Sequence, residues 1–182
     1  LHPRGIHAVS IPASICVFCG ASSGNRPEYA GAARQLGHLI AASGSTLVYG
    51  GGRAGLMGQG ADAALEKGGT VVGVITEQLM DRELGHRGIA ELITVKTMHE
   101  RKMLMADRSE AFISLAGGLG TFDELFEILS WAQLGIHRKP VGLLNTLGFY
   151  APLIQMVEHA HVAGFLRRTP RAALLLDAAP VS

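Results

Sequence analysis

The sequence has little of what marks membrane, secreted and nucleic-acid-binding proteins. No apolar run approaches the roughly 20 residues of a membrane span, and residues 1–14 lack the apolar middle of a signal peptide. The 16 basic and 15 acidic residues are scattered, without the clusters of lysine and arginine that follow a nucleic-acid backbone. We therefore expect a cytoplasmic protein with no nucleic-acid and no membrane partner.

Cysteine is also scarce. The two cysteines, Cys16 and Cys19, form a Cys-x-x-Cys pattern of the kind found in redox pairs and in half of a zinc site. They lie in an apolar run that predicts a strand, where residues three apart point to opposite faces, and no second pair completes a tetrahedral site. The pattern favours structural cysteines, and we expect no metal.

The sequence does hold enough apolar residues for one domain. Its 182 residues are 48% hydrophobic and 17% charged, which suits one sizeable core but not two full domains. Apolar β-branched runs alternate with helical patterns, and most runs lack the polar alternation of a half-exposed strand. We predict a Rossmann-like, doubly wound α/β fold with a mainly parallel sheet and helices on both faces.

The expected boundaries follow from these patterns. Residues 1–14 form an irregular N-terminal segment, and residues 15–182 form a single nucleotide-binding α/β domain. Strands are expected at 15–19, 46–49, 70–75, 91–95, 111–115 and 140–144, and helices near 27–43, 55–67, 98–109, 121–134 and 149–163. Residues 76–90 have no clear period and predict a polar loop. The tail either adds a last strand near 173–176 or covers a dimer contact.

Glycine-rich loops follow the expected strands. The segment 115–124 joins a strand to a helix through Gly117, Gly118 and Gly120. Unpaired amides and the helix dipole favour an anion at a helix N-terminus, and glycine lets the backbone approach it closely. Other loops follow strands in the same way at 20–24, 50–55 and 97–102. Because ligands bind at the carboxyl ends of parallel strands, these loops predict a phosphate-binding crevice.

Neither common nucleotide motif is complete. Gly118-x-Gly120 lacks the third glycine of a dinucleotide fingerprint, and residues 52–58 lack the Gly-Lys-Ser/Thr ending of a P-loop. Thr121 and Glu124 also fit a capping box, Thr-x-x-Glu, as do residues 97–100, so helix capping alone would explain both. From spacing alone, Glu124 remains open between a helix cap and a catalytic acid.

Four segments together resemble one protein family. They are Gly-Gly-Gly-x-x-Gly-Leu-Met-Gly at 50–58, Met-His-Glu-Arg-Lys at 98–102, Gly-Gly-x-Gly-Thr-x-x-Glu at 117–124 and Trp-Ala-Gln-Leu-Gly-Ile-His at 131–137. In this order, and from about residue 15 to residue 165, the chain resembles the LONELY GUY (LOG) proteins. These are cytokinin riboside 5'-monophosphate phosphoribohydrolases, formerly labelled lysine decarboxylases.

The resemblance implies a homodimer that hydrolyses the bond between an adenine-type base and ribose 5-phosphate without a cofactor. It implies Arg101 and Glu124 as the catalytic pair. The nucleotide-binding positions that it implies are Glu83, Lys102, Gly117, Gly118, Leu119, Gly120 and Thr121. The chain departs from the family at Ala116, where proline is usual, but alanine keeps every ligand group of the loop.

Breaking an N-glycosidic bond builds positive charge on the ribose ring, as in glycoside hydrolysis. We expect an ionised Glu124 to stabilise this charge or to accept a proton from the attacking water. Arg101 would fix Glu124 and the ribose, while the amides of the glycine loop hold the 5'-phosphate.

Two other classes of protein remain open. A non-catalytic nucleotide-binding or sensing module would use the same loops and release no base. A pyridoxal-phosphate decarboxylase needs a lysine Schiff base, for which the sequence offers four lysines, although the chain is short for that chemistry.

Overall fold

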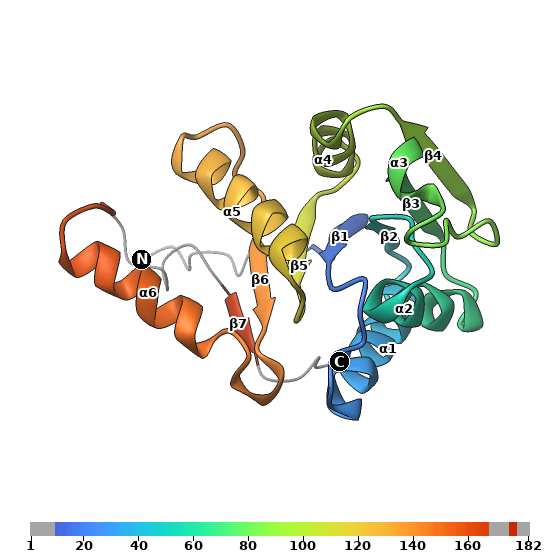
Figure 1. Ribbon diagram of the computed structural model, residues 1–182, viewed down its shortest axis with the longest axis horizontal. Coiled ribbons are helices and arrows are strands. Elements are labelled where there is room, and N and C mark those ends of the chain that lie inside the picture. Colours follow the sequence, from blue (N-terminus) through green and yellow to red (C-terminus); the bar gives the residue numbers. More distant parts are fainter. Residues whose placement is uncertain (1–9, 168–174, 178–182) are drawn as a thin grey trace, which may run out of the picture.

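A computed structural model describes residues 10–167 and 175–177 of the chain (Figure 1). The strands are β1 (Ser14–Phe18), β2 (Thr46–Tyr49), β3 (Val71–Thr76), β4 (Glu91–Val95), β5 (Ala111–Ser114), β6 (Val141–Leu144) and β7 (Leu175–Asp177). The helices are α1 (Pro27–Ala42), α2 (Gly55–Glu66), α3 (Glu77–Met80), α4 (Met98–Asp107), α5 (Leu119–Gln133), the 3-10 helix η1 (Thr146–Gly148) and α6 (Ala151–Val162).

All seven strands pair in parallel in one sheet, in the order β4-β3-β2-β1-β5-β6-β7. The chain runs outward from β1 to β4, returns to place β5 beside β1, and then runs outward to β7. The strand order therefore reverses between β1 and β5. In an open parallel sheet, this reversal opens a crevice at the carboxyl ends of the two strands.

Two apolar clusters lie on the two faces of the sheet, which confirms the predicted layers. One cluster joins β1 and β2 to α1 and α2, and the other joins the opposite side of the same strands to α4 and α5. Figure 1 shows α1 and α2 together on one side and α5 on the other. Cys19 belongs to the first cluster and Cys16 to the second, so the two thiols point to opposite faces, as predicted.

The predicted strands and long helices are confirmed to within a few residues, and two boundaries need correction. Residues 76–90 are not wholly loop, because they contain the short helix α3, whose Thr76 hydroxyl caps it by accepting from the Leu79 amide at 3.3 Å. Helix α5 begins at Leu119 rather than at 121. The last strand lies at Leu175–Asp177, and the rest of the predicted segment 173–176 lies outside the described residues.

Within the described part of the chain, no helix combines the length and the apolar character that a bilayer crossing requires.

Candidate active site

A pocket of about 660 Å³ opens at the carboxyl edge of the sheet, beside the reversal in strand order. Its walls come from the loops after β1, β2 and β5, from the loop after α3, and from side chains of α1, α2, α4 and α5. The predicted convergence of the strand-end loops on one crevice is therefore confirmed. The predicted site residues on the pocket wall are Glu83, Arg101, Gly117, Gly118, Gly120, Thr121 and Glu124.

The N-terminus of α5 forms one wall of the pocket. Gly118 occupies the N-cap position, and no side chain caps the helix. The amides of the first turn therefore lack a capping acceptor on the side where Gly118, Gly120 and Thr121 line the pocket. Such an end is suited to an anion, because its amides and the helix dipole both present positive charge.

The early start of α5 also decides whether Thr121 and Glu124 form a capping box, which their spacing left open. Thr121 lies inside the first turn and not at the N-cap, so Thr121 and Glu124 do not form a capping box. By contrast, the Thr97–Glu100 box is present: Thr97 accepts from the Glu100 amide at 3.1 Å, and the Glu100 carboxylate accepts from the Thr97 amide at 3.2 Å. Capping therefore explains the acid of α4 but not Glu124.

The first glycine of the loop before α5, Gly117, is packed against its neighbours without room for a side chain. The Gly20 amide donates to the Ala116 carbonyl at 3.0 Å, which ties the loop after β1 to the loop after β5. A Cβ on Gly117 would overlap the Thr121 hydroxyl. This close fit keeps Thr121 buried beside the pocket wall and explains why the position requires glycine.

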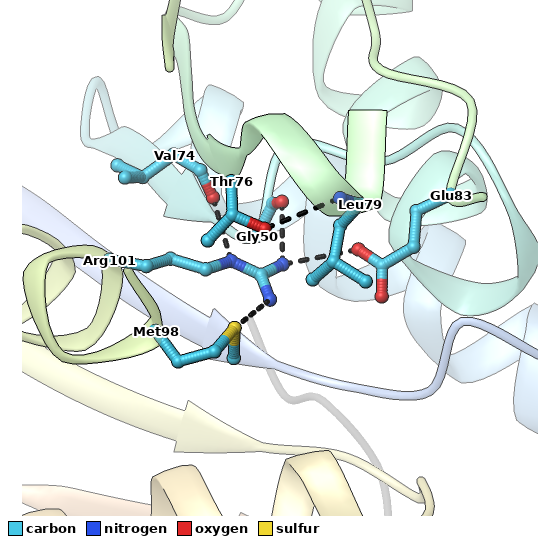
Figure 2. Close-up of polar contacts among 7 residues, drawn as sticks. All are labelled: Gly50, Val74, Thr76, Leu79, Glu83, Met98 and Arg101. Carbon is cyan, nitrogen blue, oxygen red and sulfur yellow. Dashed lines mark hydrogen bonds and ion pairs between the residues drawn. The ribbon is translucent and has the colours of Figure 1, made fainter. Parts of the chain in front are cut away.

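Arg101 is buried in the opposite wall, with 4% of its surface exposed (Figure 2). Its Nε donates to the Val74 carbonyl at 2.9 Å, and its Nη2 donates to the Gly50 carbonyl at 2.7 Å. The same Nη2 forms an ion pair with Glu83 Oε2 at 3.2 Å. The guanidinium is thus fixed by the ends of β2 and β3 before any ligand arrives.

The third guanidinium nitrogen of Arg101, Nη1, has a weaker hydrogen-bond partner than the other two. Among the described residues, the partner of Nη1 is the sulfur of Met98 at 3.9 Å, a weak acceptor. No hydrogen bond joins Arg101 to Glu124 within the same residues, so the expected direct fixing of Glu124 by Arg101 is replaced by an ion pair with Glu83. Arg101 keeps donor capacity at Nη1 for a ligand.

The loop that carries Glu83 is itself firmly held. The Arg53 amide donates to the Glu83 carbonyl at 2.9 Å, and the His86 amide donates to the Gly51 carbonyl at 2.8 Å. The buried His86 ring contacts Asp62 on α2, with 2.8 Å between Nε2 and Oδ1. Sequence reasoning missed His86, and no motif points to it, because its partners lie 24 and 35 positions away.

Glu124 projects from the first turns of α5 into the pocket and is partly buried. Desolvation raises the pKa of Glu124 to about 7, against the opposing effect of the Arg101 charge. The carboxylates of Glu83 and Asp123 raise it further, and the Lys102 charge lowers it. A carboxyl group with this pKa exchanges protons near neutral pH and is suited to acid–base chemistry.

Two predicted site residues do not line the pocket. The Leu119 side chain is 86% exposed, so only its backbone amide, in the first turn of α5, lies close to the wall. The Lys102 ammonium turns away to α5, where it contacts Asp123 Oδ2 at 2.9 Å and Glu127 Oε2 at 3.0 Å.

An apolar part of the wall was not predicted. It consists of Leu56 and Met57 at the start of α2, Tyr29 on α1, and Phe149 after η1. The Tyr29 and Phe149 rings meet edge to face with 6.0 Å between centroids. Leu56 and Met57 belong to the motif at 50–58, whereas Tyr29 and Phe149 carry no local signature and are brought together by the packing of α1 against η1. They offer a surface for a flat apolar group.

The fold and the pocket define an α/β protein with a pocket suited to a small, anionic ligand at the strand reversal of a parallel sheet. Comparison with known proteins narrows this class. Residues 57–180 match a family model described as "Possible lysine decarboxylase". The chain is 49% identical over 166 residues to a cytokinin riboside 5'-monophosphate phosphoribohydrolase of Rhodococcoides fascians, covering 91% of this chain and 84% of that protein.

An Arabidopsis thaliana protein with the same enzyme name is 49% identical over 161 residues, covering 88% of this chain and 76% of its own. Among solved structures, the molybdenum cofactor carrier protein of Chlamydomonas reinhardtii superimposes with a TM-score of 0.70 at 21% identity, covering 91% of this chain and 89% of that chain. That likeness shows the fold alone. The chain belongs to the LONELY GUY (LOG) family of phosphoribohydrolases.

Proposed function

We propose that the protein hydrolyses the N-glycosidic bond of adenosine 5'-monophosphate or of N6-modified riboside 5'-monophosphates and releases the base and ribose 5-phosphate. The observation that carries this proposal is that Arg101, Glu124 and the uncapped N-terminus of α5 line one pocket. The relatives at 49% identity carry the name of this activity.

Each part of the substrate can contact a suitable part of the pocket wall. The 5'-phosphate binds at the start of α5, where the amides of Leu119, Gly120 and Thr121 point outward along the helix axis. The ribose lies between Arg101 and Glu124. The base lies against the apolar wall that includes Tyr29 and Phe149. Binding the phosphate, which does not react, positions the reacting carbon.

The reaction then depends on the raised pKa of Glu124, which makes its carboxylate a better proton acceptor than that of an ordinary glutamate. The bond from C1' to the base nitrogen breaks, the base leaves with the electron pair and takes up a proton from solvent, and positive charge develops on the ribose. The Glu124 carboxylate stabilises that charge and accepts a proton from the water whose oxygen bonds to C1'. Arg101 Nη1 donates to the ribose and holds it in place.

A product assay tests the function directly. Purified protein is incubated with adenosine 5'-monophosphate and with its N6-isopentenyl derivative, and free base and ribose 5-phosphate are quantified by chromatography. We expect stoichiometric release of both products and a loss of turnover in Glu124→Gln, with nucleotide binding retained. Binding of both nucleotides by the wild-type protein without any product would instead identify a sensing module. Lysine-dependent release of carbon dioxide on addition of pyridoxal phosphate would identify a decarboxylase.

We also propose a homodimer. Several large apolar side chains of α5 and the turn after it face solvent in the single chain: Leu119, Phe126, Leu134 and Ile136. An exposed apolar strip of this kind on a helix is typical of a subunit contact. Sedimentation equilibrium is expected to give twice the 19.2 kDa mass of one chain. The cytoplasmic location stays a prediction.

A further inference from the structure

Lys102 occupies an unusual position for a cation that the family resemblance assigns to the nucleotide. Its side chain is only 10% exposed and lies between α4 and α5. The ammonium contacts Asp123 Oδ2 at 2.9 Å and Glu127 Oε2 at 3.0 Å. Lys102 does not line the pocket, and two carboxylates already satisfy its charge.

The two acids are arranged to receive a cation. Asp123 and Glu127 are four residues apart on α5, so they lie on the same face of the helix, where two like charges repel each other. Lys102 removes this repulsion. Burial lowers the pKa of Lys102, but the hydrogen bonds to Asp123 and Glu127 outweigh burial and raise it, so the ammonium stays charged.

The bridge joins the two helices that carry the proposed catalytic pair. Lys102 follows Arg101 directly on α4, and Asp123 precedes Glu124 directly on α5. The two helices lie on the same face of the sheet, yet their backbones make few close contacts. The side-chain bridge therefore fixes the orientation of the first turns of α5 relative to α4.

We propose that Lys102 is a positioning residue that acts through α5: with Asp123 and Glu127 it fixes the place and the charge environment of Glu124, and it does not bind the nucleotide. This inference rests on the proposed hydrolase function.

The sign of the electrostatic effect follows from the groups around Glu124. They are Arg101 and Lys102 on α4, Asp123 on α5, Glu83 on the loop after α3, Cys16 on β1, Cys19 just after β1, and Tyr150 before α6. Removing the Lys102 charge takes away a cation and therefore raises the pKa of Glu124. Removing the acids takes away the Asp123 charge and therefore lowers it. Loss of a contact with the substrate phosphate would instead raise KM.

The experiment measures kcat, KM and the acid limb of the pH–rate profile in the full-length protein. In Lys102→Met we expect kcat to fall roughly tenfold through misplacement of Glu124, with KM within about twofold of wild type. The acid limb is expected to move to higher pH by roughly half a unit. The acid limb is expected to move to lower pH in the double variant that combines Asp123→Asn with Glu127→Gln. Lys102→Arg is expected to keep the wild-type limb, because it keeps the charge.

The control is another ion pair of α4. Arg108, at the end of the helix, contacts Glu91 Oε2 at 3.1 Å on the exposed surface, so Arg108→Met removes an ion pair without touching α5. It is expected to leave kcat and the profile unchanged. Circular dichroism and thermal unfolding of every variant check that the fold is retained.

The outcomes separate cleanly. If Lys102→Met raises KM by tenfold or more while kcat and the limb stay in place, Lys102 binds the nucleotide and the inference is wrong. If both the lysine and the double-acid variants shift the limb in the same direction, the electrostatic argument is wrong. If the wild-type protein releases no base at all, the proposed function fails instead, and the chemical shift of the Glu124 carboxyl carbon, followed by NMR titration, still tests the opposite pKa shifts.

Discussion

The pH dependence of turnover follows from the position of Glu124. A glutamate in water titrates near pH 4.3, whereas desolvation in this pocket raises the pKa of Glu124 to about 7. If the ionised carboxylate is the active form, kcat/KM falls below the plateau as pH drops through this value. The expected loss is about tenfold at pH 6 and about 100-fold at pH 5. An unperturbed glutamate would keep almost full activity at both.

The assay follows base release at substrate concentrations below KM from pH 5 to 9, in buffers of constant ionic strength. The substrate phosphate also titrates, with a second pKa of about 6, so the profile of kcat at saturating substrate is measured as a second curve. Ionisation of the free phosphate affects only kcat/KM, whereas Glu124 titrates in both curves: in the free protein for kcat/KM and in the complex for kcat.

Two results would refute this reasoning. A plateau that extends unbroken from pH 8 down to pH 5 would show that the carboxyl group titrates normally, so that desolvation does not govern it. Activity that rises as the pH falls below 7 would show that the protonated form is active, and Glu124 would then act as an acid on the leaving base rather than as a carboxylate beside the ribose.

Three further predictions follow from the same contacts. Because the folded-state pKa of Glu124 is raised, the ionised form opposes folding and stability is lost as the pH rises from about 4.5 to about 7. The free energy of unfolding of Glu124→Gln, measured by chemical denaturation, should therefore exceed that of wild type by roughly 3 kcal/mol at pH 8, with little difference at pH 4. Glu83→Gln removes the ion pair that orients Arg101 and should lower kcat/KM roughly tenfold without loss of helix content by circular dichroism. Gly117→Ala would place a methyl group against the Thr121 hydroxyl, so it should raise KM for the nucleotide by at least about tenfold, measured by steady-state kinetics. An unchanged KM in this last variant would show that the loop moves aside.

Regular structure was predictable because it is encoded locally. Strands covered on both faces leave unbroken apolar runs, as in β3, whose six residues are all buried. The four-residue helix α3 was missed because so short a segment has no measurable period. The start of α5 was misplaced because Thr121 and Glu124 imitate a capping box, whereas the helix begins at Leu119 with Gly118 at its N-cap.

The site was predictable only where its residues cluster in the sequence. The family resemblance predicted Arg101 and Glu124, and both line the pocket, but no spacing encodes the carbonyls of Gly50 and Val74 that hold the guanidinium. Those contacts exist because β2 and β3 are neighbours in the sheet and Tyr49 pairs with Gly73, so that the next residues, Gly50 and Val74, lie side by side. The apolar wall of Tyr29 and Phe149 was missed for the same reason, since 120 positions separate two rings that touch.

The division of charge across the pocket explains why Glu124 keeps a high pKa beside a buried arginine. A direct ion pair between Arg101 and Glu124 would favour the ionised carboxylate and bring its pKa well below 7, which would make it a poor proton acceptor. Here the guanidinium is bound instead by Glu83 and by two backbone carbonyls. Glu83 also repels Glu124 and raises its pKa. The same acid therefore orients the arginine and preserves the basicity of the second carboxylate, so its role does not depend on contact with substrate.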